Sequence, residues 1–205
     1  MKKILLLLIG LSLQSCTAQT NFDQAEIRKQ ITVEETRSIL FTLAHDDMKG
    51  RDTKSGGYQK AAAYVTNYLQ THGIQPFYAA YRDSLVTDSL TSYNLVGQIG
   101  NYDPKRKTVL LGAHLDHIGI QEGEGDQIFN GANDNAAGST AVLQIARFLA
   151  QHQWEQNLLI ALFADEEKGL KGAFHLAERM KSEKVDLAYM VNFEMIGTTL
   201  TTGEN

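Results

Sequence analysis

The chain has 205 residues, of which 43% are hydrophobic and 21% charged, and it carries a formal net charge of -5. These proportions belong to a globular protein rather than a disordered one, and the length predicts one domain with a sizeable core. The acidic balance and the lack of a basic stripe argue against a nucleic-acid partner.

The N-terminus has the pattern of a secretory signal. Two lysines precede an apolar run over residues 4–13, which is too short to span a bilayer but suits the apolar region of a signal peptide. The LQSC sequence that ends at Cys16 resembles a bacterial lipobox, in which a lipidated cysteine becomes the new N-terminus and attaches the protein to a membrane. The alternative is ordinary cleavage after Ala18, which would discard the only cysteine. Either way, residues 1–18 predict export, to the periplasm or cell envelope as a lipoprotein or as a secreted protein.

Residues 19–31 are polar and predict a tether, which leaves residues 32–205 for the folded domain. The sequence TVEE at residues 32–35 is a capping box, so a helix is expected to begin there and to run through Ala44. Residues 119–133 form a glycine-rich acidic loop, and its acidic part, Gln121–Gln127, reads as a solvated lid at the mouth of a pocket rather than as a calcium site.

Strands and helices alternate through the rest of the chain. Apolar runs predict strands at residues 75–81, 93–99, 108–113, 158–164 and 187–193, and helical spacing predicts helices at residues 57–72, 136–150 and 170–180. From residue 108 onwards the pattern is βαβαβ, which predicts an α/β fold with a mostly parallel central sheet and helices on both faces. Ligands of such sheets bind outside the carboxyl ends of the strands.

Five side chains of metal-binding type follow the last three predicted strands at that edge: His114, Asp134, Glu166, Glu167 and Glu194. Imidazole and carboxylates without a nearby cysteine are the ligands of a catalytic zinc site rather than a structural one. One carboxylate of such a cluster can bind the metal while another serves as general base for a metal-bound water. Asp116 points to the same side as His114 in an extended chain and is expected to orient that imidazole.

Each residue also has an ordinary structural interpretation when taken alone. His114 could be a loop histidine beside a solvated aspartate, and Asp134 could be a helix N-cap. Glu166 and Glu167 could be acidic residues of a solvated helix N-terminus. Glu194 is different, because an unpaired charge among apolar neighbours would be costly without a cation. The metal site is favoured because separate sequence positions converge on one edge of the sheet.

The strings AHLDHIG, GANDNAAGS, ADEEKGLKGA and NFEMIG, in this order, resemble the two-zinc aminopeptidase family of clan MH, and the resemblance extends upstream to MKGRDTKSGGYQKAAAYV. It implies the zinc-exopeptidase fold and a metallopeptidase that hydrolyses N-terminal residues from peptides. The implied zinc ligands are His114, Asp134, Glu167 and Glu194, with Asp134 bridging two ions. Glu166 would be the general base, and Asp116 would orient His114. The peptide bond between Asp134 and Asn135 would be cis, as it often is in that family.

The sequence departs from the family pattern at two points. Glu194 stands where the family usually has an aspartate, so either the strand end lies slightly further from the metal or the carboxylate binds in a different mode. The family also supplies another histidine to the second zinc from a segment well beyond NFEMIG. We find no replacement among the remaining histidines, and His117, although near the site, stands at a position that is not a ligand in the family. The expectation is an incomplete catalytic domain over residues 32–205, with weak or no activity.

Two other functions remain open. A glutaminyl-cyclase-like aminoacyltransferase uses a related sheet with one zinc, so the metal stoichiometry separates it from a peptidase. A catalytically silent binding domain of the same fold would be indifferent to the loss of Glu166. The joint presence of Glu166, His114 and Asp134 opposes that interpretation, because a silent domain has no chemical reason to keep them.

Overall fold

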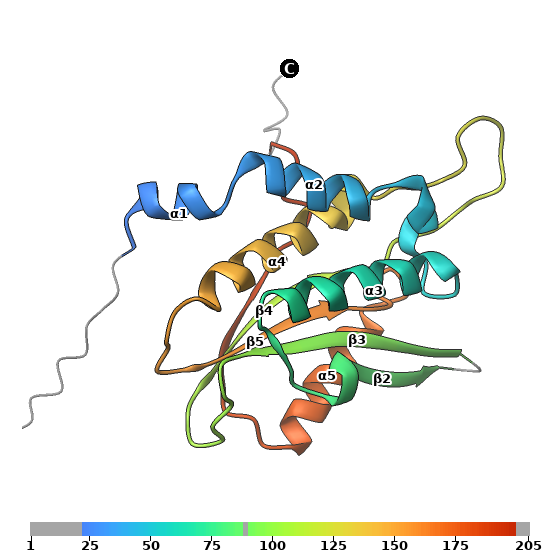
Figure 1. The fold of residues 1–205 in the computed structure, drawn as a ribbon. Helices are drawn as coiled ribbons and strands as arrows, with labels where there is room; N and C mark the ends of the chain where they lie inside the picture. The colour runs from blue at the N-terminus through green and yellow to red at the C-terminus, as the bar shows by residue number, and fades with distance from the viewer. Residues whose placement is uncertain (1–21, 88–89, 200–205) are drawn as a thin grey trace, which may run out of the picture.

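The computed structural model describes residues 22–87 and 90–199, so the predicted export signal and Cys16 lie outside the described residues. Helices and strands pack around one six-stranded sheet (Figure 1). The strands are β1 Gln75–Pro76, β2 Arg82–Thr87, β3 Leu90–Ile99, β4 Thr108–His114, β5 Asn157–Phe163 and β6 Leu187–Asn192. The helices are α1 Gln24–Gln30, α2 Val33–Leu43, α3 Gly56–Thr71, α4 Gly138–Leu149 and α5 Lys171–Ser182, with short helical turns at η1 Asp46–Arg51, η2 Ala79–Tyr81 and η3 Ala132–Ala137.

The sheet combines parallel and antiparallel strands. β4 lies between β5 and β6 and is parallel to both, while β3 is antiparallel to β5, β1 and β2. The chain passes from β4 through α4 to β5, and then through α5 across β4 to β6, so α4 and α5 lie on opposite faces (Figure 1). The predicted α/β fold class is confirmed. The strand order reverses beside β4, and such a reversal is where open α/β sheets bind ligands.

Apolar side chains of β5 alternate between the two faces of the sheet. Leu158, Ile160 and Leu162 belong to the core shared with α2, α3 and α4, whereas Leu159 and Phe163 belong to the smaller core shared with α5. A strand covered on both faces needs apolar residues at every position, which explains the uninterrupted run LLIALF. In contrast, β6 is exposed along its whole length.

The helix boundaries follow the predicted capping residues. Thr32 Oγ1 accepts a hydrogen bond from Glu35 N at 3.2 Å, and α2 begins at Val33 as the capping box predicts. α3 ends before Gly73, whose φ of 70° is the left-handed conformation of a helix C-terminus. None of the helices within residues 22–87 and 90–199 is long and apolar enough to cross a membrane.

Two segments before β3 differ from the sequence prediction. Residues 19–31 are not a tether throughout, because they include α1, and the Phe22 ring beside it packs on Phe148 and Trp154 with centroid distances of 4.9 and 5.9 Å. Residues 75–81 hold only the two-residue strand β1 and the turn η2. The sequence does not predict β2, because its segment RDSLVT carries too few apolar residues to be distinguished from a loop.

Candidate metal centre

β4 ends at His114, whose backbone is fixed from two sides. Ser139 Oγ donates a hydrogen bond to the His114 carbonyl oxygen at 2.8 Å. The next residue, Leu115, donates its backbone N–H to the Phe163 carbonyl oxygen at 2.8 Å. Ser139 lies on α4 and Phe163 on β5, so a covering helix and a neighbouring strand hold His114 at the carboxyl edge of the sheet.

The His114 ring is buried among acceptors. Its Nδ1 lies 3.0 Å from the carbonyl oxygen of Asp116, so Nδ1 is the donor and Nε2 is the atom available to a ligand. Nε2 lies 3.0 Å from Asp134 Oδ1 and 3.2 Å from Glu194 Oε1. Burial alone would lower the pKa of His114, but Asp116, Glu194 and Glu166 outweigh it and raise that pKa to about 9.

Asp134 faces two imidazoles with its two carboxylate oxygens. Oδ1 lies 3.0 Å from His114 Nε2, and Oδ2 lies 3.9 Å from His117 Nδ1. Asp134 belongs to η3, directly before α4, and its peptide bond to Asn135 is cis, as the family resemblance implies. One carboxylate between two imidazoles has the arrangement of a ligand that bridges two metal ions.

The turn after β5 contributes two further carboxylates. Glu167 Oε1 lies 2.6 Å from His117 Nδ1, and Glu166 Oε2 lies 3.9 Å from His114 Nε2. Burial raises the pKa of Glu166, and the charges of Glu167 and Glu194 add to this effect despite the opposing charge of His114. A carboxylate with a raised pKa at a metal site suits a general base.

Asp165 holds this turn in a conformation that residues other than glycine rarely adopt, with φ at 53°. Its buried carboxylate accepts hydrogen bonds from the hydroxyls of Ser92 and Thr53, and Lys168 Nζ lies 3.3 Å from it. Burial alone would raise the pKa of Asp165, but these partners lower it, so the carboxylate stays charged. The turn is thus fastened to β3 and to the loop after η1.

Asp116 fastens the same turn from the other side. Its Oδ1 accepts a hydrogen bond from Glu166 N at 3.1 Å, and its Oδ2 accepts one from Glu167 N at 3.3 Å. The Asp116 carboxylate lies 3.7 Å from His114 Nδ1, which is longer than a hydrogen bond. The Asp116 carbonyl group, rather than its carboxylate, therefore orients the imidazole.

The ligand atoms form two groups, and within each group all atoms lie within 4.8 Å of one another. One group is His114, Asp134 and Glu194, and the other is His117, Asp134 and Glu167. Nitrogen and carboxylate oxygen donors without sulfur suit zinc, and a divalent cation would offset the repulsion among the carboxylates. The residues fit a metal, and the structure brings the five side chains predicted from the sequence to one edge of the sheet.

His117 is a member of the second group that the family pattern does not assign. The sequence contains one signal for it, because His117 follows His114 by three residues in the loop that leaves the same strand. This signal is weak in isolation, since nothing in the spacing shows which way the loop turns.

Arg51 lies fully buried beneath the site and joins its loops. The guanidinium donates hydrogen bonds of 2.6 to 2.9 Å to four carbonyl oxygens, those of Leu43, Leu115, Asn130 and Gly131. Burial lowers the pKa of Arg51 to about 10, which still leaves it charged at neutral pH. Arg51 thus connects the loop after β4 with the loop that leads to Asp134.

Asn135 joins the start of α4 to the end of β6. Its Nδ2 donates to the Phe193 carbonyl oxygen at 2.9 Å and lies 3.3 Å from Glu194 Oε2. Its Oδ1 accepts a hydrogen bond from Gly138 N at 3.0 Å. No sequence pattern predicts these contacts of Asn135, which positions Glu194 beside the first ligand group.

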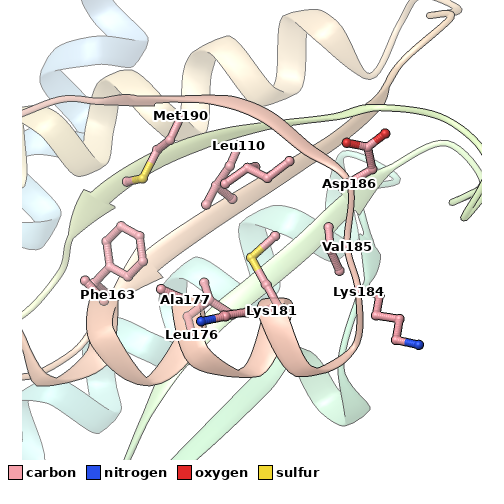
Figure 2. Close-up of a pocket in the computed structure, with 12 residues that line it drawn as sticks. Leu110, Phe163, Leu176, Ala177, Lys181, Lys184, Val185, Asp186 and Met190 are labelled. Atoms are coloured by element: carbon pink, nitrogen blue, oxygen red, sulfur yellow. The ribbon is translucent and has the colours of Figure 1, made fainter.

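The apolar groove between α5 and β6 is a separate feature (Figure 2). Phe163, Leu176 and Met190 line it, and its lining includes none of the imidazoles or carboxylates of the two ligand groups. The groove is therefore distinct from the two ligand groups at the carboxyl edge of the sheet.

Known sequences related to this chain are zinc peptidases. The family model described as Peptidase family M28 matches residues 94–202. A probable zinc metalloprotease of Pyrenophora teres f. teres is 28% identical over 150 residues, which cover 73% of this chain and 30% of that protein. Leupeptin-inactivating enzyme 1 of Streptomyces exfoliatus is 28% identical over 164 residues, which cover 78% of this chain and 34% of that protein. The matched part of this chain spans about a third of the length of these relatives.

Solved structures share the fold. The LapA aminopeptidase of Legionella pneumophila matches with a TM-score of 0.69 at 19% identity, over 85% of this chain and 48% of that chain. A glutaminyl cyclase of Porphyromonas gingivalis matches with a TM-score of 0.66 at 16% identity, over 83% of this chain and 63% of that chain. At these identities the likeness concerns the fold alone, which proteins of both activities share.

Replacing Arg51 with lysine tests the buried guanidinium. A lysine keeps the charge but cannot reach four carbonyl groups with a planar fork, so the unfolding free energy of Arg51→Lys should fall by about 2–4 kcal/mol. Arg37→Lys, on the exposed surface of α2, is the matched control and should change it by less than about 0.5 kcal/mol. Equal stabilities of the two variants in urea denaturation would rule out the anchoring role.

Zinc binding should release protons near neutral pH. Because the pKa of His114 is raised to about 9 in the metal-free chain, its imidazole is protonated at neutral pH and must lose a proton to become a ligand. Calorimetric zinc titrations in buffers of different ionisation enthalpy should show this release, and it should diminish as the pH rises through the pKa of His114. A binding enthalpy at neutral pH that does not depend on the buffer would contradict the prediction.

Proposed function

The chain belongs to peptidase family M28, and from this premise we propose that it is an exported zinc-dependent aminopeptidase. The observation that carries the proposal is Asp134, whose two carboxylate oxygens face the imidazoles of two ligand groups. The zinc metalloprotease among the relatives supports zinc as the metal. The substrates are peptides with a free N-terminus, because the acidic edge of the site attracts an ammonium group.

Zinc held by these residues would polarise the scissile carbonyl group and activate a water molecule. Glu166 would accept a proton from the attacking water and return it to the leaving amine. Its raised pKa favours uptake of the proton from the water, and Asp116 and Asp165 keep its turn at the site. Glu194 is the most exposed of the ligand carboxylates, with 43% of its side chain accessible, so the substrate amine would approach from its side.

Export rests on the signal pattern of residues 1–18 and is a proposal of its own. If Cys16 is the lipidated N-terminus, the mature protein begins at that residue and carries a covalently bound lipid. Mass spectrometry of the protein purified from the producing cells decides this, since cleavage after Ala18 yields a product without Cys16. A mature protein that still contains residues 1–13 would contradict the export proposal.

Replacing Glu166 with glutamine tests the proposed general base. The amide cannot take up the proton, so turnover of aminoacyl-anilides with added zinc should fall about 10²–10⁴-fold in Glu166→Gln, while the zinc content stays unchanged. Glu178→Gln, on the exposed surface of α5, is the matched control and should leave turnover unchanged. The assay is made on this chain and on any longer form of the protein that contains it. Undiminished turnover by Glu166→Gln would overturn the assignment.

A glutaminyl-anilide separates hydrolysis from the alternative transferase. A peptidase releases the aromatic amine, whereas a cyclase closes the α-amine onto the side-chain amide, releases ammonia and leaves the anilide bond intact. Ammonia release without aromatic amine would therefore replace the peptidase proposal with the cyclase. Zinc binding with neither product, from this or any other aminoacyl-anilide, would favour a silent binding domain.

A further inference from the structure

We propose that Asn94 is a positioning residue of the metal centre, because its buried side chain closes the turn that carries Glu166 and Glu167. The inference rests on the proposed function, since it concerns the general base and a ligand of the same site. Asn94 lies on β3, whereas the metal-binding side chains follow β4, β5 and β6. It therefore acts on the site through the backbone of the turn.

The Asn94 amide bridges the two ends of that turn, Ala164 and Gly172. Its Oδ1 accepts a hydrogen bond from Ala164 N at 2.9 Å, and its Nδ2 donates one to the Gly172 carbonyl oxygen at 2.9 Å. Gly172 N also donates to the Ala164 carbonyl oxygen at 3.0 Å, which completes the closure. Asn94 is fully buried, so water cannot replace these bonds when the amide is removed.

Gly172 leaves the space that the amide occupies. A Cβ atom at this position would overlap Asn94 Oδ1 and the Ala164 carbonyl oxygen. Because the second of these neighbours is backbone, a side chain at position 172 would push the two ends of the turn apart. The closure therefore depends on a glycine at one end of the turn and on the asparagine of β3 beside it.

Asp83 fixes the orientation of the Asn94 amide. It lies opposite Asn94 on β2, and its Oδ2 accepts a hydrogen bond from Asn94 Nδ2 at 2.8 Å. An ionised carboxylate only accepts hydrogen bonds, so Nδ2 faces Asp83 and Oδ1 faces Ala164. Asp83 is itself fully buried, and its Oδ1 lies 2.9 Å from Arg179 and 3.1 Å from His175, both on α5. The amide is thus held in the orientation that closes the turn.

β3 contacts the inside of the turn as well as its ends. Ser92 precedes Asn94 by two residues, so both side chains point to the same face of the sheet, and the Ser92 hydroxyl donates to Asp165 within the turn. With its ends and its interior fixed in this way, the turn holds Glu166 and Glu167 at the metal centre. If the closure is lost, the ends can separate and both carboxylates lose their fixed place.

The competing role for Asn94 is general stability, which a buried amide with several hydrogen bonds supplies anywhere in the fold. Asn157 is such an amide at the opposite end of β5, and it is 4% exposed. Its Oδ1 accepts from Asp103 N at 2.9 Å, and its Nδ2 donates to the carbonyl oxygens of Asp103 and Arg106 at 2.8 and 3.0 Å. Asn157→Ala is therefore the matched control, because it loses comparable bonds far from the turn.

Hydrogen exchange of the backbone amides, in protein freed of metal with a chelator, gives the first test. The N–H groups of Glu166 and Glu167 should exchange at least about tenfold faster in Asn94→Ala than in Asn157→Ala, because only the first variant lets the turn open locally. Gly172→Ala, which keeps the asparagine but separates the ends of the turn, should behave like Asn94→Ala. The second variant decides the question if the first does not fold.

Turnover of aminoacyl-anilides with added zinc gives the second test, made on this chain and on any longer form of the protein that contains it. In Asn94→Ala kcat should fall about 10²-fold, since a small displacement of a catalytic group has an effect of this size. KM should change little, because the amide is buried and its partners are backbone groups and Asp83. Asn157→Ala should keep the kcat of the unchanged protein.

The outcomes separate the inference from the proposed function. Equal exchange of the Glu166 and Glu167 amides in Asn94→Ala and Asn157→Ala, or an undiminished kcat in Asn94→Ala, would overturn the positioning role and leave the peptidase proposal standing. An unchanged protein without turnover would instead overturn the proposed function. The exchange rates would then decide by themselves whether Asn94 holds the turn.

Discussion

The candidate metal centre depends on turns whose backbone is held by buried polar side chains. Asp116 accepts the backbone N–H groups of Glu166 and Glu167, and Asp165 accepts two hydroxyl groups from segments distant in sequence. Arg51 holds the loop after β4 and the loop before Asp134 by donating hydrogen bonds to the carbonyl oxygens of Leu115, Asn130 and Gly131. All three anchoring side chains are at least 97% buried, so water cannot replace a bond that is lost when a partner moves. The metal-binding side chains are therefore held close together before a metal ion binds.

This arrangement has an electrostatic consequence. Burial raises the pKa of Glu166, and the neighbouring carboxylates, which are fixed close together and cannot separate, add to this effect. The carboxylates around His114 outweigh the effect of its burial and raise its pKa to about 9. Protons and divalent cations thus compete for the same atoms. The same constraint serves the proposed chemistry, since a raised pKa makes Glu166 a stronger base for the proton of the attacking water.

The strand order decides which elements supply these groups. His114 ends β4, the acidic turn follows β5, and Glu194 follows β6, and these are the three neighbouring parallel strands. β6 is exposed along its length, with the apolar groove beside it (Figure 2). Asn135 anchors the ligand that follows β6 by contacting both Phe193 and Glu194.

By itself the sequence determined the local features: the capping box at residues 32–35, the apolar runs of β4 and β5, and the presence of metal-type side chains at strand ends. These local features depend on residues close together in the sequence, because helix caps and side-chain periodicity act over a few positions. Only the tertiary structure decided β2, the contacts of Asp116 and Arg51, and the place of His117 in the second ligand group. Asp116 reaches a partner 50 residues away and Arg51 one 64 residues away, and no short pattern records which distant backbone group a buried side chain will meet.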